Sequence, residues 1–207
     1  LVASHTSPDR HFEQFTSQLF QEEMTGSTLN MHYTIADPKT FGISEYEPVL
    51  PIYHSDQPED SKEHCSDLLH RLDRIDPDRL SPENAYTYRL LHRSLENDLA
   101  LADFPYYNEP LSPSSGMQSQ LPVLLAEYTF RTKRDVTDYL ALLDQIDDYF
   151  SSLLLYEQEK AAAGFFMPAC SSEKVRKQCD TIVTTEELAQ GTHFLQTTFE
   201  DRLSELQ

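Results

Sequence analysis

Eight histidines make a metal site the first chemistry to test in this sequence. A zinc site on a helix needs two ligands at spacing i, i+3 or i, i+4 and a third ligand elsewhere. His64 and His70 lie on different helix faces, and no His-Glu-x-x-His motif occurs. His92 and Glu96 have the i, i+4 spacing, but an exposed polar pair explains them more simply. The sequence therefore predicts no metal ligand within this chain.

Nucleophilic catalysis has no better support. The Gly-x-Ser-x-Gly elbow is absent, and Ser115 precedes Gly116 without a flanking strand. Cys170 follows an apolar connector, but no spacing to a histidine gives that position a catalytic meaning. Cys170 and Cys179 could form a disulfide, although nothing requires one, and Cys65 completes the set of three cysteines. We therefore predict no catalytic residue, and interpret Ser115 as a loop serine and Cys170 as a buried cysteine.

The most suggestive side chains are aromatic. His32 and Tyr33 are adjacent, and Tyr106 and Tyr107 open a long loop that runs through Gly116. Tyrosine combines an apolar ring with a polar hydroxyl, which suits the wall of a binding site. Core packing with a satisfied hydroxyl is the simpler alternative, and the residues alone do not decide between the two.

The composition predicts an all-α fold. Leucine occurs 27 times against 12 valines and isoleucines together, and there are only five glycines. Strands need β-branched residues and hairpin turns, and neither is prominent here. We expect an irregular bundle of about seven helices in a single domain over residues 1–207. The expected helices begin or end at these positions: Pro8 to Gly26, Thr28 to Ala36, Glu59 to Ile75, Ser81 to before Pro105, Ser172 to Val183, Thr185 to Gly191, and a last helix to Gln207.

The longest expected helix runs from Lys133 to Ala163, opened by a capping box at Thr132 and Asp135. Before it, an ordered loop is expected from Pro105 to Pro122. The apolar stripe of the helix over 133–163 should face the core, and the acidic residues of this helix should form a solvated face. The expected stripe is Val136, Leu140, Leu143, Ile146, Phe150 and Leu154, and the acidic residues are Asp144, Asp147 and Asp148.

The net charge excludes some partners. With 35 acidic against 16 basic residues, the formal charge is −19. Nucleic-acid binding requires Lys and Arg to displace counterions from phosphates, so we expect no nucleic-acid partner. No apolar stretch is long enough to span a membrane. The first residue is Leu1 and the last helix has no stop signal, so we expect the chain to be the N-terminal part of a longer protein.

Two further segments carry short motifs in a recognisable order. Leu29-Asn30-Met31-His32-Tyr33 precedes Asp37-Pro38-Lys39-Thr40-Phe41-Gly42-Ile43. The motifs that follow are Ile75-Asp76, Leu80-Ser81, Pro110-Leu111, Gly116, Gln120-Leu121-Pro122, Tyr139-Leu140, Leu143, Gly164, Met167-Pro168, Val175 and Phe199-Glu200-Asp201-Arg202-Leu203.

This ordered set resembles the bacterial domain-of-unknown-function family numbered 885, over nearly the whole chain. Members of that family are longer, mostly helical, and look like gluzincin-type zinc metallopeptidases whose HE-x-x-x-H-like motif lies in the C-terminal half. The resemblance implies that this chain is the N-terminal helical part of such a protein. It would have no zinc ligand and no activity alone, with zinc bound in the full-length protein.

The resemblance also implies partners: the protein's own C-terminal domain and a peptide substrate. The residues expected to line the substrate cleft are His32, Tyr33, Tyr106, Tyr107 and Gly116. An extracellular or cell-envelope location is favoured over the cytoplasm. The alternative function is a non-catalytic acidic helical interaction domain, whose charge would steer a basic partner.

Overall fold

The computed structural model describes residues 7–53 and 57–206, and every regular element within these ranges is helical. The all-α prediction is therefore confirmed, with more helices than the number expected. The elements are α1 (Pro8–Thr25), α2 (Thr28–Thr34), the 3-10 helix η1 (Pro38–Phe41), α3 (Gln57–Leu72), the 3-10 helix η2 (Pro77–Arg79), α4 (Pro82–Leu101), α5 (Met117–Ala126), α6 (Lys133–Asp144), α7 (Ile146–Ala162), α8 (Ala169–Ile182), α9 (Thr185–Gln190) and α10 (Phe194–Glu205).

The chain forms two compact units, which are described separately. Unit 1 comprises residues 1–26, 37–46 and 54–107, and unit 2 comprises residues 27–36, 47–53 and 108–207. The expectation of a single domain stays a prediction. Among the described residues, no helix has both the length and the apolar character needed to cross a lipid bilayer.

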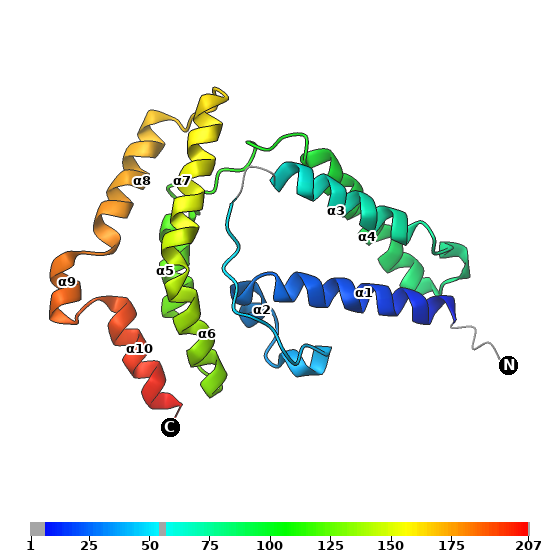
Figure 1. The fold of residues 1–207 in the computed structure, drawn as a ribbon, viewed down its shortest axis with the longest axis horizontal. Coiled ribbons are helices and arrows are strands. Elements are labelled where there is room, and N and C mark those ends of the chain that lie inside the picture. Colours follow the sequence, from blue (N-terminus) through cyan, green and yellow to red (C-terminus); the bar gives the residue numbers. More distant parts are fainter. Residues whose placement is uncertain (1–6, 54–56, 207) are drawn as a thin grey trace. The chain divides into compact units, whose positions relative to one another are not determined.

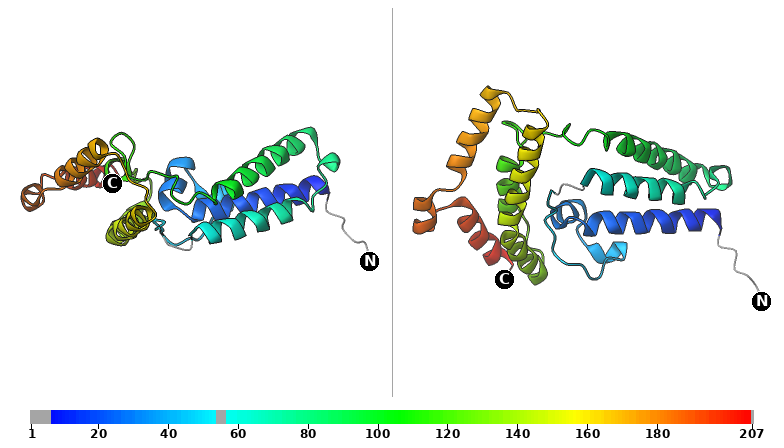
Figure 2. Two further views of the ribbon diagram at one scale, coloured as in Figure 1. Left: turned by 90° about the horizontal axis from the view of Figure 1, so that it is seen from above. Right: turned by 45° about the horizontal axis from the view of Figure 1, so that its top comes forward.

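Unit 1 is built on three helices. The pair α3 and α4 runs antiparallel, with α1 beside it (Figures 1 and 2). Apolar residues at helical spacing on α1, α3 and α4 bury one side of each helix in the core of this unit. The buried residues of that core are Phe12, Phe15, Leu68, Leu72, Ile75, Tyr88 and Leu95.

The starts of α1 and α4 are tied together by side chains that the sequence marks as caps. Ser7 and Ser81 cap the two helices by accepting from the backbone N–H groups of Arg10 and Asn84. Asp9 accepts from the Ser81 N–H at 2.9 Å and from the Asn84 side-chain amide at 2.7 Å. These hydrogen bonds, led by the one from the Ser81 backbone, lower the pKa of Asp9.

Unit 2 is organised around α5, which packs against both α8 and α10. The helix α2 and the extended residues 47–53 join the same unit, since the Thr28 N–H donates to Val49 O at 3.0 Å. In return, the Val49 N–H donates to Thr28 Oγ1 at 2.8 Å. The buried core of unit 2 consists of Leu29, Leu50, Leu121, Leu125, Tyr128, Phe130, Tyr139, Leu142, Tyr149 and Leu153.

The helix expected from Lys133 to Ala163 is not continuous. The predicted capping box at Thr132 and Asp135 is confirmed, but α6 ends at Asp144 and α7 begins at Ile146. At the break, the Gln145 side chain donates to Pro48 O and to Ala141 O, both at 3.0 Å, and accepts from the Leu50 N–H at 2.9 Å. A side chain that inserts into the helical hydrogen-bond ladder in this way interrupts a helix.

The apolar stripe predicted for α6 and α7 is partly wrong. Leu140 and Leu154 are exposed, while Tyr139 and Leu153, one position earlier, are buried. The other four predicted positions only flank the core, as half-buried residues. The predicted solvated face is confirmed, because Asp144, Asp147 and Asp148 are all exposed.

The expected loop from Pro105 to Pro122 is shorter than predicted. Helix α5 begins at Met117 and contains Pro122 in its interior. Proline removes one helical hydrogen bond. In α5 its neighbours Leu121 and Leu125 are almost fully buried, and this burial offsets the loss.

Helix α8 also begins earlier than the expected cap at Ser172. The carbonyl of Pro168 accepts from the backbone N–H groups of Ser171 at 2.9 Å and Ser172 at 3.0 Å, so the first turn starts at Ala169. Helices α2 and α3 also differ from their expected bounds. Helix α2 ends at Thr34, and α3 runs from Gln57 to Leu72. The predicted end of α9 at Gly191 is confirmed, with the glycine in the left-handed conformation at φ 65°.

Candidate functional site

The two adjacent candidates, His32 and Tyr33, are placed by helix α2. The Ser27 side chain caps this helix, and Leu29 anchors it in the core of unit 2. Neighbouring residues on a helix point about 100° apart, so one of the pair can be buried while the other is exposed. His32 is buried, and Tyr33 is 46% exposed.

His32 packs tightly against the segment that follows α5. Its ring stacks on Tyr128 with the ring centroids 3.7 Å apart and the planes 13° from parallel. Its Nε2 accepts a hydrogen bond from the Thr129 N–H at 3.1 Å. Because a backbone N–H can only donate, Nε2 accepts this hydrogen bond and carries no proton.

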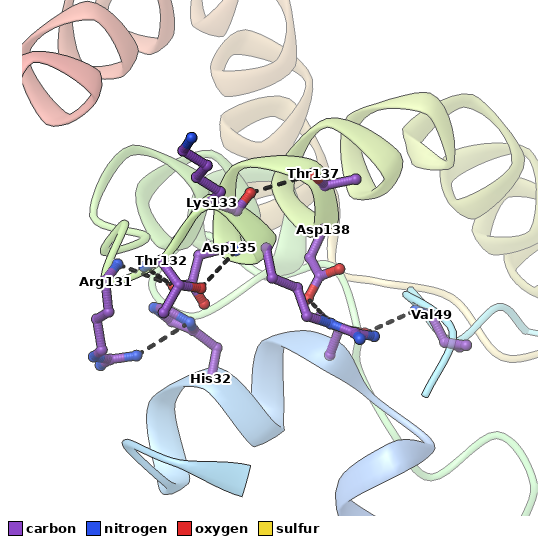
Figure 3. A network of polar contacts seen from close by, with 10 residues as sticks. His32, Val49, Arg131, Thr132, Lys133, Asp135, Thr137 and Asp138 are labelled. Atoms are coloured by element: carbon purple, nitrogen blue, oxygen red, sulfur yellow. Dashed lines mark hydrogen bonds and ion pairs between the residues drawn. The ribbon is translucent and has the colours of Figure 1, made fainter. Parts of the chain in front are cut away.

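The surroundings of His32 disfavour its charged form. Burial lowers its pKa to about 4. The positive charge of Arg131 acts in the same direction, Asp135 opposes it, and Arg202 adds a smaller decrease. Arg131 Nη1 lies 3.4 Å from Nδ1 (Figure 3). Near neutral pH, His32 is therefore a neutral, fixed hydrogen-bonding group.

The carboxylate of Asp135 lies in the same region and caps α6. One carboxylate oxygen accepts from the Arg131 N–H at 3.0 Å, the Thr132 N–H at 2.6 Å and the Thr132 hydroxyl at 2.9 Å. Figure 3 shows His32 directed at this turn from α2. The turn thus fixes the Arg131 backbone beside the histidine ring.

Arg202 on α10 completes the cluster from the other side. Its Nη1 donates to Leu125 O at 2.9 Å and to Tyr128 O at 2.5 Å, so a cation covers the carbonyls at the C-terminal end of α5. Its guanidinium carbon lies 4.7 Å from the Phe130 ring centre and 4.9 Å from that of Tyr139. The sequence analysis did not select Arg202, although it lies in the final motif. The aromatic residues that it contacts, Phe130 and Tyr139, are far from it in the sequence.

Tyr33 presents its ring at the surface while its hydroxyl is fixed. The hydroxyl donates to Leu124 O at 2.6 Å, and the ring stands edge-on to His32 at 5.3 Å. Burial of the hydroxyl end, followed by the charge of Glu127, raises the pKa of Tyr33. An exposed ring with its rotation restricted can contact a ligand with little loss of side-chain entropy.

The structure does not gather the other candidates around this pair. Gly116 is the N-cap of α5, about 15 Å from the other end of that ten-residue helix. A Cβ there would lie 2.0 Å from Gln118 Oε1 and 2.2 Å from the Ser112 nitrogen, so packing alone requires glycine. Tyr106 and Tyr107 belong to unit 1, where Tyr107 is 78% exposed and Tyr106 is half-buried.

The groups weighed as metal ligands or nucleophiles form no such site. His92 Nε2 lies 3.1 Å from Asp73 and its Nδ1 3.6 Å from Glu96, as in a surface polar cluster. In the described ranges, no three His, Cys, Asp or Glu side chains are grouped to hold a metal ion. Both Cys170 and Cys179 are exposed, so the interpretation of Cys170 as a buried cysteine is wrong. Their separation along α8, about 13 Å, is too great for a disulfide.

Comparison with known families decides the family. The sequence model of the family described as "Bacterial protein of unknown function (DUF885)" matches residues 39–206. The chain belongs to the DUF885 family. The resemblance stated from the motifs is thereby confirmed, while the peptidase-like activity stays a proposal. No curated protein and no solved structure matches this DUF885 chain.

Proposed function

We propose that this chain is the N-terminal helical part of a zinc-dependent, peptidase-like protein, and that unit 2 lines part of its substrate cleft. The observation that carries the proposal is the pair His32 and Tyr33, an exposed ring whose hydroxyl is tied down beside a neutral, immobilised imidazole. Such a pair can contact and orient a peptide without taking part in proton transfer.

The described residues do not fit a zinc site, because they contain no suitable group of three ligands. Zinc bound in the full-length protein would polarise a peptide carbonyl and activate water. The roles left to this chain are binding and orientation. Tyr106 and Tyr107 are proposed as further wall residues, and Gly116 shapes the loop that leads into α5.

The test uses the full product of the gene that encodes this chain, with its zinc content and peptide hydrolysis measured. Tyr33→Ala should raise KM and lower kcat/KM by about tenfold, since it removes a contact made with bound substrate. Tyr33→Phe keeps the ring and should retain most of the activity. Tyr86→Ala, at another exposed tyrosine on α4, is the matched control and should behave like the unsubstituted protein.

An open reading frame that ends near Gln207, or a full-length protein without zinc and without hydrolysis, would refute this proposal. The second candidate function, a non-catalytic acidic interaction domain, is favoured by the formal charge of −19. It predicts salt-sensitive binding of a basic protein by this chain alone.

A further inference from the structure

One basic side chain of unit 2 is almost completely buried. Lys160 on α7 is 2% exposed, and its Nζ lies 2.6 Å from a carboxylate oxygen of Glu109. The same Nζ donates to Asn108 O at 3.1 Å, and the Tyr156 hydroxyl donates to that carbonyl at 3.2 Å. A buried ammonium needs such partners, so these contacts hold residues 108 and 109 on α7.

A second carboxylate near this lysine lacks a hydrogen-bond donor. Glu157 precedes Lys160 by three residues on α7, and its Oε1 is buried without a hydrogen bond. Residues at this spacing lie on one helix face and can form an ion pair. The lysine therefore has two acidic neighbours, of which only Glu109 is bound.

Glu109 belongs to a segment that is held at several points. We call residues 108–116 the strap. Its Leu111 packs against the core of unit 2, and Pro110 O accepts from the Met117 N–H at 2.9 Å. At its middle residue, Ser112 O accepts from the Gln118 side-chain amide at 2.7 Å. Releasing Glu109 would thus free one end of a segment whose other end stays attached.

We propose that Lys160 exchanges between Glu109, with the strap closed, and Glu157, with the strap open, so that the strap is a proton-sensitive latch. The closed state leaves a buried carboxylate oxygen unsatisfied, which costs free energy. In the open state Lys160 binds the Glu157 carboxylate, so the lysine has an acidic partner in both states. Two arrangements that each satisfy part of one charge cluster are the physical basis of a switch.

The proton acts on Glu157. Burial raises the pKa of this residue, with Lys160 opposing and Glu109 adding to the increase. Protonation removes the unpartnered charge, so acid favours the closed strap. As pH rises through this raised pKa, Glu157 ionises and competes for Lys160. Two tyrosines face the cluster. The Tyr156 hydroxyl donates to the Asn108 carbonyl beside the lysine, and Tyr53, which senses the charge of Glu157, has a pKa raised chiefly by burial and stays neutral throughout.

Hydrogen–deuterium exchange of the strap tests the latch, with rates corrected for the intrinsic effect of pH. Protection of the Met117 amide, which donates to Pro110 O next to Glu109, should fall between about pH 5 and about pH 8. The fall should approach tenfold for each unit by which the pKa of Glu157 differs between the two states. Glu157→Gln should keep protection high at both pH values.

Two further variants make the test specific. Glu159→Gln removes a charge from the same helix and should retain the pH response of the unsubstituted chain. Glu109→Gln should lower strap protection at every pH, with circular dichroism verifying that the helices are intact. A pH-independent strap in the unsubstituted chain, an unaltered pH response in Glu157→Gln, or full protection in Glu109→Gln would each overturn the proposal.

Discussion

The side-chain amide of Gln145 binds the backbone of the extended segment at Leu50 as a neighbouring strand would. Its Oε1 accepts from the Leu50 N–H at 2.9 Å, and its Nε2 donates to Pro48 O at 3.0 Å. One side chain therefore both interrupts the helix between α6 and α7 and attaches residues 47–53 to unit 2.

Replacing Gln145 should destabilise unit 2. Gln145→Ala leaves the partly buried Leu50 N–H and Pro48 carbonyl without partners, and should lower the free energy of unfolding by about 1–3 kcal/mol. Urea denaturation followed by circular dichroism measures this change. Gln196→Ala, at an exposed position of α10, is the control and should be close to neutral. Equal effects of the two substitutions would contradict the role given to Gln145.

Two leucines two positions apart on α6 should differ sharply. Leu142 has 0% exposure whereas Leu140 is 47% exposed. Leu142→Ala should therefore cost about 2–5 kcal/mol, and Leu140→Ala much less. Leu143, half-buried against the same core, should fall between them. Thermal or urea melts of the three variants give the order directly, and a reversed order would place the core on the predicted stripe instead.

Gly116 should not tolerate even alanine. The added methyl would meet the Ser112 backbone and the Gln118 side chain at 2.0–2.6 Å, so the loop or α5 must shift. We expect Gly116→Ala to cost about 1–3 kcal/mol, as overpacking does. Gly26→Ala is a suitable comparison, because its nearest atoms lie at 3.4 Å and its φ is −70°. A neutral Gly116→Ala would show that the loop adjusts freely.

His32 should make stability depend on pH. Its pKa is lowered from 6.5 to about 4 in the folded chain, so the unfolded chain binds the proton more readily. The stabilisation is present above 6.5 and is lost progressively as pH falls toward 4. Urea midpoints at about pH 7 and about pH 5 should differ more for the unsubstituted chain than for His32→Gln. His70→Gln, at an exposed histidine, should leave that difference unchanged.

Helix starts were predicted better than long-range contacts, although the expected cap at Ser172 was wrong. The caps Ser81 and Thr132 act within one helical turn, so their meaning depends little on the rest of the fold. The break at Gln145 and the helical Pro122 depend on partners distant in the chain. No pattern around either residue announces those partners.

The candidate site divides in the same way. His32 and Tyr33 were selected as neighbours with useful chemistry, and α2 does hold them together. Arg202 was missed because its carbonyl partners at Leu125 and Tyr128 are 77 and 74 residues away. Gly116 was selected for its loop, whereas steric exclusion explains it.

Unit 2 is built from three separate segments of the chain, and this order affects how it folds during synthesis. Residues 27–36 and 47–53 emerge from a ribosome well before residues 108–207, with which they pack. His32 meets the Thr129 N–H only after 97 further positions have been translated. Because contacts this distant in sequence form slowly, the early segments spend time with their apolar faces uncovered. No single proteolytic cut can release either unit whole, and a fragment starting at Asn108 would lack the partners of its own core.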